Sequence, residues 1–171
     1  MGAGKSSVGR ALGNALNCAF EDLDDRIERS EGQPIAEIFR ASGEIEFRRV
    51  ERVALKQLLQ ELADGGERVI GLGGGAFVQA DNAALLEGAG VLTVFLDAPV
   101  DDLWRRCVKQ ADSQGWKRPL LQSMEQFRIL YERRQAAYRK ASVRIQTGGR
   151  PVGEIVEEIA KTVRLEWQQS K

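Results

Sequence analysis

The stretch "MGAGKSSVGR" (residues 1–10) decides the fold. Its Gly4–Ser6 segment matches the second half of the pattern G-x-x-x-x-G-K-[ST], a loop whose backbone N–H groups surround a polyphosphate while its Lys and hydroxyl reach the outer phosphates and Mg²⁺. An amphipathic helix follows at once, because Val8, Leu12 and Leu16 recur on one face. A helix N-terminus attracts phosphate through its N–H groups and the positive end of its dipole. The stretch therefore predicts a phosphate-binding loop joined to a helix.

The loop supplies the expected ligands of ATP. We expect Lys5 to span the β- and γ-phosphates and Ser6 to ligate Mg²⁺. Backbone donors are expected along the whole loop, at Gly2, Ala3, Gly4, Lys5, Ser6 and Ser7.

Composition excludes several classes of function. Lys plus Arg and Asp plus Glu balance at 25 each, so attraction to nucleic acid or to a membrane surface is not expected. No apolar run approaches the roughly 20 residues of a membrane helix. Two cysteines do not suggest a disulfide framework, and a cytoplasmic location is expected. Because the chain contains no histidine, proton transfer must use other side chains, and phosphoryl transfer suits it since that chemistry depends on positioning, Mg²⁺ and Lys or Arg charges.

Strands and helices alternate along the chain, which predicts an α/β fold with a parallel sheet between helices. The expected strands are 17–22, 68–72, 90–96 and 143–147. The helices after the first are expected over 25–30, 34–42, 44–63, 82–86, from 99 through 107, 123–141 and 152–167. No interdomain linker is visible, so residues 1–171 are expected to form a single domain with a lid at about 112–122.

Several polar groups follow the predicted strands, where ligands of parallel sheets bind. Asp22 and Asp24 alternate on an extended segment, so we expect them to point the same way, one toward Mg²⁺ through water and the other toward a substrate hydroxyl. Asp25 is expected to be a helix cap or a first-turn acid. The run Gly73–Gly75 lets backbone approach a ligand closely. In the long polar loop, Arg118 is stiffened by the following proline and is placed to clamp a transferring phosphate.

Each of these patterns also has a purely structural interpretation. The acids can be helix caps, and three glycines can form only a turn. Arg48 can be an exposed residue that pairs with Glu44 and Glu51 in helical reach. The basic residues of the helix at 123–141 can simply face solvent.

The order and spacing of these motifs resemble the shikimate kinases over essentially the whole chain. The matching segments are "GAGKSS" (2–7), "DLD" (22–24), "GEIEFR" (43–48), "GGG" (73–75), "RPLL" (118–121), "RQAAY" (134–138) and Arg150. The resemblance implies a P-loop kinase fold with strand order 2-3-1-4-5 and an enzyme that phosphorylates shikimate with ATP and Mg²⁺ as a monomer.

The resemblance also implies a role for each site residue. Lys5, Asp24 and Arg118 would be catalytic, and Ser6 and Asp22 would hold the metal. Arg48 and Arg134 would pair with the substrate carboxylate, which suits planar, bidentate partners. Gly73, Gly74 and Gly75 would hydrogen-bond the ring hydroxyls, Asp24 would bind and help deprotonate the attacking hydroxyl, and Arg118 and Arg150 would contact ATP.

The sequence departs from the family at its N-terminus. The first glycine of the loop pattern would fall two residues before Met1, and the strand that leads into the loop is missing from the sequence. We expect the native polypeptide to start on the order of 10 residues earlier. The chain alone is expected to fold poorly or to be inactive, because that strand is central in the family's sheet and its neighbours would keep unsatisfied backbone groups.

Three other functions remain open from the residues. Gluconate kinases and other small-metabolite kinases share the loop and the fold. A domain of this kind can also serve as the ligand sensor of a transcription regulator, and a third possibility is a catalytically silent domain. The presence of Lys5, Ser6, Asp24 and Arg118 together favours an enzyme.

Overall fold

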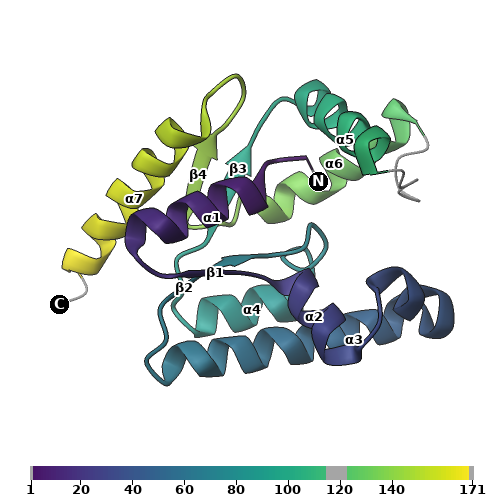
Figure 1. Cartoon of the computed structure of the whole chain (residues 1–171), viewed down its shortest axis with the longest axis horizontal. Coiled ribbons are helices and arrows are strands. Elements are labelled where there is room, and N and C mark those ends of the chain that lie inside the picture. Colours follow the sequence, from purple (N-terminus) through teal and green to yellow (C-terminus); the bar gives the residue numbers. More distant parts are fainter. Residues whose placement is uncertain (1, 115–122, 170–171) are drawn as a thin grey trace. The chain divides into compact units, whose positions relative to one another are not determined.

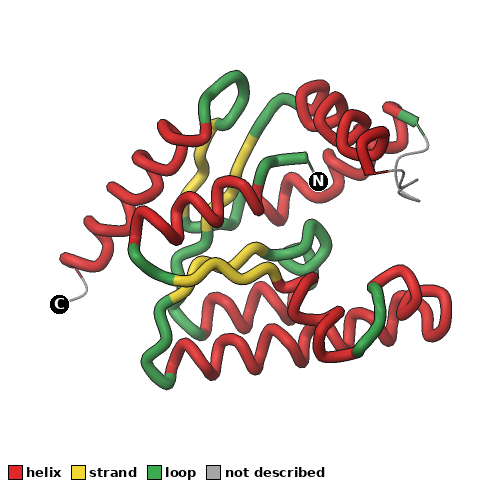
Figure 2. Tube along the Cα trace, viewed as in Figure 1, coloured by secondary structure: helices red, strands yellow, loops and turns green. Residues whose placement is uncertain are grey.

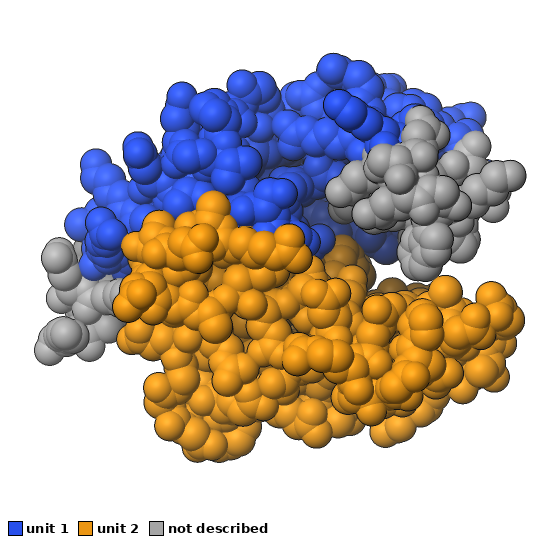
Figure 3. All heavy atoms as spheres, in the orientation of Figure 1, with its two compact units in different colours: residues 1–8, 92–171 blue, residues 9–91 orange. Residues whose placement is uncertain are grey.

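The computed structural model describes residues 2–114 and 123–169. The chain divides into two compact units, residues 1–8 with 92–171 and residues 9–91 (Figure 3). Helix α1 (Lys5–Leu16) contributes to both units. Of the helices within the described residues, none combines the length and the apolar character needed to cross a membrane.

The second unit, residues 9–91, contains one parallel pair of strands and three further helices. After α1 come β1 (Ala19–Asp22), α2 (Leu23–Glu31), α3 (Ile35–Ala63), β2 (Arg68–Gly71) and α4 (Ala80–Gly88). Strands β1 and β2 pair in parallel, with Asp22 opposite Gly71, so both strands end at the same edge. Helix α3 packs against α2 and α4, as Figure 1 shows.

The core of this unit lies between the strand pair and these helices. It is formed by apolar residues of α2, α3 and α4, among them Leu23, Ile27, Leu55 and Leu58, which are fully buried. Ile70 of β2 packs against the same cluster. The core holds fixed the edge at which β1 and β2 end.

Helix α3 contains two helical stretches. Gly43 interrupts them with φ 76° and ψ 179°, a conformation that is essentially restricted to glycine. The prediction of two helices on either side of Gly43 is therefore confirmed, although they follow one another without a separate loop.

The first unit contains the other parallel strand pair. Its elements after residue 91 are β3 (Val94–Asp97), α5 (Val100–Gln114), α6 (Met124–Tyr138), β4 (Val143–Gln146) and α7 (Val152–Gln169). β3 and β4 pair in parallel with Asp97 opposite Gln146. Helices α5 and α6 pack on each other, and α7 packs against β4 (Figure 2).

The strand pairing agrees with the order that the resemblance implies. If the family's first strand is counted ahead of the phosphate loop, β1 and β2 are its second and third strands, and β3 and β4 its fourth and fifth. The order 2-3-1-4-5 places the second beside the third and the fourth beside the fifth, and both pairs are observed. The α/β fold with parallel strands and flanking helices is thus confirmed.

Several element boundaries differ from the predictions, and two of the larger differences are at β3 and α5. β3 begins at Val94 instead of residue 90, because Gly90 takes a turn conformation with φ 62°. Helix α5 continues to Gln114, so the start of the predicted lid at residue 112 is helical. The remainder of that segment, 115–122, lies outside the described residues.

Candidate active site

The phosphate-binding loop of the first unit is held by helix α5. Gly2 has φ 67°, and a Cβ atom added there would lie 2.6 Å from the Leu103 carbonyl oxygen and 2.9 Å from Cys107 Sγ. Ala3 packs against the buried cluster that contains these two residues. Gly4, with φ 83°, has no heavy atom of the described residues within 4 Å of its added Cβ. The loop is therefore packed against α5 at Gly2, whereas no described residue crowds it at Gly4.

Helix α1 begins at Lys5, directly after this loop. The first N–H groups of a helix have no partner inside it and carry the positive end of its dipole. The first turn of α1 contains no acidic side chain, so nothing in Lys5–Leu16 neutralises that end. The arrangement of loop and helix matches the prediction made from the sequence.

The acidic residues lie at the edge where β1 ends. Asp22 is the last residue of β1 and the N-cap of α2, and its Oδ1 accepts a hydrogen bond of 3.1 Å from the Asp24 N–H. Asp25 is an acid in the first turn of α2, which is one of the two roles that the sequence predicted for it. The expectation that Asp22 and Asp24 alternate on a strand is wrong, because α2 begins at Leu23 and Asp24 is helical.

The glycine run brings these acids and Arg48 into one neighbourhood. A Cβ on Gly71 would lie 3.3 Å from Asp22 Oδ2, and one on Gly73 would lie 2.7 Å from Asp24 Oδ1. A Cβ on Gly75 would lie 2.6 Å from an Arg48 terminal nitrogen. The absence of side chains in Gly73–Gly75 is thus what lets the Asp24 carboxylate and the Arg48 guanidinium approach the same stretch of backbone.

The Arg48 guanidinium is held by two carboxylates of its own helix. It donates to Glu51 at 2.9 and 3.0 Å and, through Nε and Nη2, to Glu44 at 3.3 and 3.1 Å. Glu51 is only 1% exposed, whereas the Glu44 side chain is 67% exposed. Burial would lower the pKa of Arg48, but the two carboxylates raise it above its ordinary value. The guanidinium therefore remains charged, with a fixed partner on one side and an exposed one on the other.

Two of the predicted cations in the first unit are Arg134 and Arg150. Arg134, on α6, is beside Tyr138: burial raises the pKa of Tyr138, and the Arg134 guanidinium, which hydrogen-bonds to its hydroxyl, opposes the rise. Arg150 precedes α7 and donates to the Gln146 carbonyl at 2.9 Å and to Glu158 at 2.7 Å. Arg118, the predicted lid residue, lies outside the described residues.

The predicted site residues thus fall into two groups, one in each unit. We call Gly2–Ser7 and Arg150 the phosphate-side group. Arg134 also lies in the first unit, but it is expected to bind the acceptor. We call Asp22, Asp24, Arg48 and Gly73–Gly75 the acceptor-side group, and its members lie together in the second unit.

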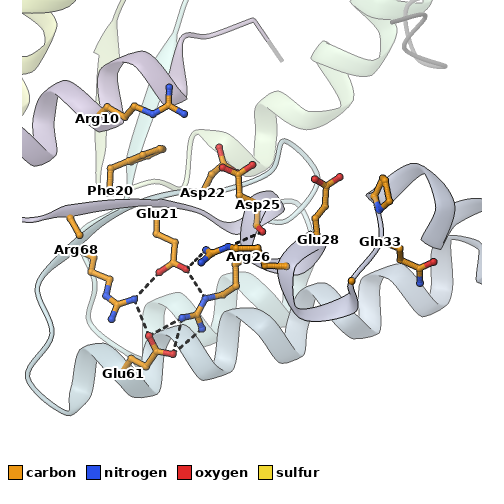
Figure 4. A pocket seen from close by; sticks show the side chains of 14 residues that line it. Arg10, Phe20, Glu21, Asp22, Asp25, Arg26, Glu28, Gln33, Glu61 and Arg68 are labelled. Carbon is orange, nitrogen blue, oxygen red and sulfur yellow. Dashed lines mark hydrogen bonds and ion pairs between the residues drawn. The ribbon is translucent and has the colours of Figure 1, made fainter.

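A broad pocket beside β1 and α2 contains only one of these residues. Asp22 lines it, together with an ionic cluster in which Glu21 accepts hydrogen bonds from Arg26, Arg29 and Arg68, while Glu61 also binds Arg26 (Figure 4). Each of these arginines is paired with a carboxylate of the cluster. The cluster joins β1, β2, α2 and α3 and stabilises the unit.

Sequence reasoning did not find the burial of Glu51 or the role of Asn82. Glu51 was recognised only as an ion-pair partner in helical reach of Arg48. The signal for its burial was present, since Phe47, Glu51 and Leu55 are spaced by four residues and share the apolar face of α3. Asn82 is 1% exposed and binds the residue that follows the glycine run.

The parallel strand pairs, the glycine loop that opens a helix, and the acid–arginine–glycine group define an α/β P-loop phosphotransferase of the kind that acts on small metabolites. Comparison with known proteins narrows this class. The family model of shikimate kinase matches residues 1–164. The chain belongs to the shikimate kinase family, whose members are ATP-dependent kinases.

Individual relatives agree with this assignment. The shikimate kinase of Thermus thermophilus is 41% identical over 164 residues, covering 94% of this chain and 84% of that protein. The solved structure of the Acinetobacter baumannii shikimate kinase in complex with shikimate has a TM-score of 0.81 at 33% identity, covering 97% of this chain and 89% of that one. A gluconokinase structure from Sinorhizobium meliloti covers 100% of this chain and 93% of its own, with a TM-score of 0.58 at 22% identity, so that similarity concerns the fold alone.

Proposed function

We propose that this protein transfers the γ-phosphoryl group of ATP to the 3-hydroxyl of shikimate, giving 3-phosphoshikimate and ADP, a step of aromatic amino-acid biosynthesis. The observation that carries the proposal is the acceptor-side group. There the Asp24 carboxylate and the Arg48 guanidinium both lie against a glycine run that leaves no space for side chains. This combination offers a proton acceptor, a carboxylate-binding cation and bare backbone for hydroxyl groups within one region.

The phosphates of ATP are assigned to the loop and the start of α1. Gly2, Ala3, Gly4, Lys5, Ser6 and Ser7 would bind them, the backbone through N–H groups and Lys5 through its charge. Lys5 would also stabilise the negative charge that moves from the transferred group toward ADP. The seating of Gly2 on α5 supports this role, because a fixed loop needs no rearrangement when the nucleotide binds.

A magnesium ion is assigned to Ser6 and Asp22. Hydroxyl and carboxylate oxygens are hard ligands of the kind Mg²⁺ prefers, and this ion is often held by one or two protein groups plus phosphate and water. Among the described residues no cluster of three or more His, Cys, Asp or Glu side chains could hold a metal by itself. When bound, the ion would neutralise charge on the phosphates.

Asp24 is assigned as the base for the attacking hydroxyl. The new bond joins the 3-oxygen of shikimate to the γ-phosphorus, the bond from that phosphorus to the ADP oxygen breaks, and the hydroxyl proton passes to Asp24. The N-cap hydrogen bond between Asp22 Oδ1 and the Asp24 N–H holds this acid at the start of α2. Arg118 is assigned to clamp the transferred group.

Recognition of the substrate carboxylate is assigned to Arg48 and Arg134. The Nε–Nη2 edge of Arg48 is the edge suited to bidentate binding, and here it donates to Glu44. Because Glu44 is exposed and Glu51 is buried, a substrate carboxylate would displace Glu44 while Glu51 keeps the guanidinium in place. Arg150 is assigned to the adenine side, and the protein would act as a monomer with one catalytic domain.

The test is a coupled assay of ADP release by the full-length protein with shikimate, gluconate or no acceptor. We expect ADP release that depends on shikimate, with gluconate no better than the blank. Turnover of gluconate but not of shikimate would show that gluconate is the acceptor and shikimate is not. Nucleotide binding without turnover of either compound would favour a ligand sensor.

A further inference from the structure

Asn82 is a buried amide that the proposed chemistry does not use. It lies in the first turn of α4 and is 1% exposed. Its Nδ2 donates a hydrogen bond of 3.1 Å to the Ala76 carbonyl, while its Oδ1 is buried without a hydrogen-bond partner among the described residues. A buried acceptor without a partner costs free energy, which a leucine of similar size would not cost there. The presence of an asparagine here is therefore best explained by the hydrogen bond that its Nδ2 donates to the Ala76 carbonyl.

The group that Asn82 holds is the turn that follows the glycine run. Ala76 is fully buried, and its N–H donates to the Gly73 carbonyl at 3.1 Å. Its carbonyl accepts from Asn82 Nδ2 and, more weakly, from the Gln79 N–H at 3.3 Å. One end of the run Gly73–Gly75 is thus fixed by strand β2, which ends at Gly71, and the other by the amide of Asn82.

The position of this turn decides how two site residues sit. A Cβ atom added to Gly73 would lie 2.7 Å from Asp24 Oδ1, and one added to Gly75 would lie 2.6 Å from an Arg48 nitrogen. Because both side chains lie this close to the backbone of the run, a shift of the turn would move that backbone relative to both of them. We propose that Asn82 is a positioning residue, which fixes the glycine turn and through it the spacing between the Asp24 carboxylate and the Arg48 guanidinium. This inference rests on the proposed function.

The test compares Asn82→Leu with Leu86→Ala. Leu86 is 5% exposed and lies one helical turn further along α4, so its truncation loosens the same helix without removing the amide. We expect Asn82→Leu to raise the KM for shikimate about fivefold, the effect of losing one hydrogen bond, with the KM for ATP within about twofold. Leu86→Ala should lower the melting temperature and leave the KM for shikimate unchanged.

A second measurement does not depend on turnover. Amide hydrogen exchange should become faster in residues 73–79 of Asn82→Leu than in the same residues of Leu86→Ala. If the exchange of this segment and the KM for shikimate are both unchanged in Asn82→Leu while the wild type turns over, the positioning role is wrong. If the wild type does not phosphorylate shikimate at all, the proposed function fails first, and unchanged exchange in residues 73–79 would then show that Asn82 does not fix the turn either.

Discussion

In the first unit the groups assigned to phosphate are mostly backbone atoms, whereas in the second unit two side chains, Asp24 and Arg48, are assigned to the acceptor together with the glycine backbone beside them. Gly2 and Gly4 take positive φ values, and the loop meets α1 at Lys5 with no acid in its first turn. In the second unit Arg48 is bound by Glu44 and Glu51, and Asp24 and Arg48 rest against Gly73 and Gly75.

This difference has a physical origin. Phosphate is a large, highly charged anion that a helix end and a row of N–H groups recognise almost regardless of the neighbouring side chains. A small hydroxylated carboxylate needs a base and a planar cation at set positions, and these positions depend on what packs around them. Substitutions around the acceptor-side group should therefore affect the acceptor while nucleotide binding is kept.

The largest effect is expected for Asp24→Asn. Loss of the base should reduce kcat about 10²- to 10⁴-fold while ATP still binds. The matched control is Asp25→Asn, which removes the exposed first-turn acid next to it and should leave kcat nearly unchanged. Steady-state ADP release and nucleotide titration measure both quantities, and an undiminished kcat in Asp24→Asn would remove that carboxylate from the mechanism.

A smaller but still large effect is expected for Gly73→Ala. The new Cβ would lie 2.7 Å from Asp24 Oδ1, so the carboxylate must move. A misplaced base should reduce kcat about 10- to 100-fold. Gly88→Ala is the control, because no atom of the described residues lies within 4 Å of its added Cβ. Equal kcat values for the two variants would mean that Gly73 does not set the position of Asp24.

The third comparison uses the two acids that hold Arg48. Glu51→Gln weakens a buried, charge-assisted hydrogen bond and should raise the KM for shikimate about tenfold. Glu44→Gln changes the exposed partner that the substrate is expected to displace, so its KM for shikimate should be equal to or below that of the wild type. If Glu44→Gln weakens shikimate binding as much as Glu51→Gln does, Glu44 holds the guanidinium instead of yielding to substrate.

The sequence predicted the fold, and the turns and helix starts on which the candidate site residues lie, because the motifs are local. Gly4–Ser6, Gly73–Gly75 and Gly43 could be assigned from neighbouring residues, and the structure has each in a corresponding turn or helix start. Asp22 shows why caps and sites are hard to separate from sequence, since the residue assigned to the metal also caps α2. The depth at which Glu51 lies and the hydrogen bond from Asn82 to Ala76 depend on packing between segments far apart, which spacing alone does not encode.

The smallest effect is expected for acid stability. Burial alone would raise the pKa of Glu21, but hydrogen bonds from Arg26, Arg68 and Arg29 bring it below its ordinary value. A lowered folded-state pKa stabilises the protein above the unfolded pKa, and that stabilisation is lost as pH falls through the folded value. Thermal melts of Glu21→Gln should therefore lose less stability on acidification than those of the wild type, whereas Glu67→Gln, at an exposed acid outside the ionic cluster, should follow the wild type.

The most direct test of the account follows the phosphoryl group itself. Phosphorus NMR of the full-length protein with ATP, Mg²⁺ and shikimate should show a new phosphomonoester signal coupled to the ring proton at position 3, growing in step with ADP. That result would confirm that the acceptor-side group presents this hydroxyl to ATP. Release of inorganic phosphate alone, or an ester at a different hydroxyl, would contradict it.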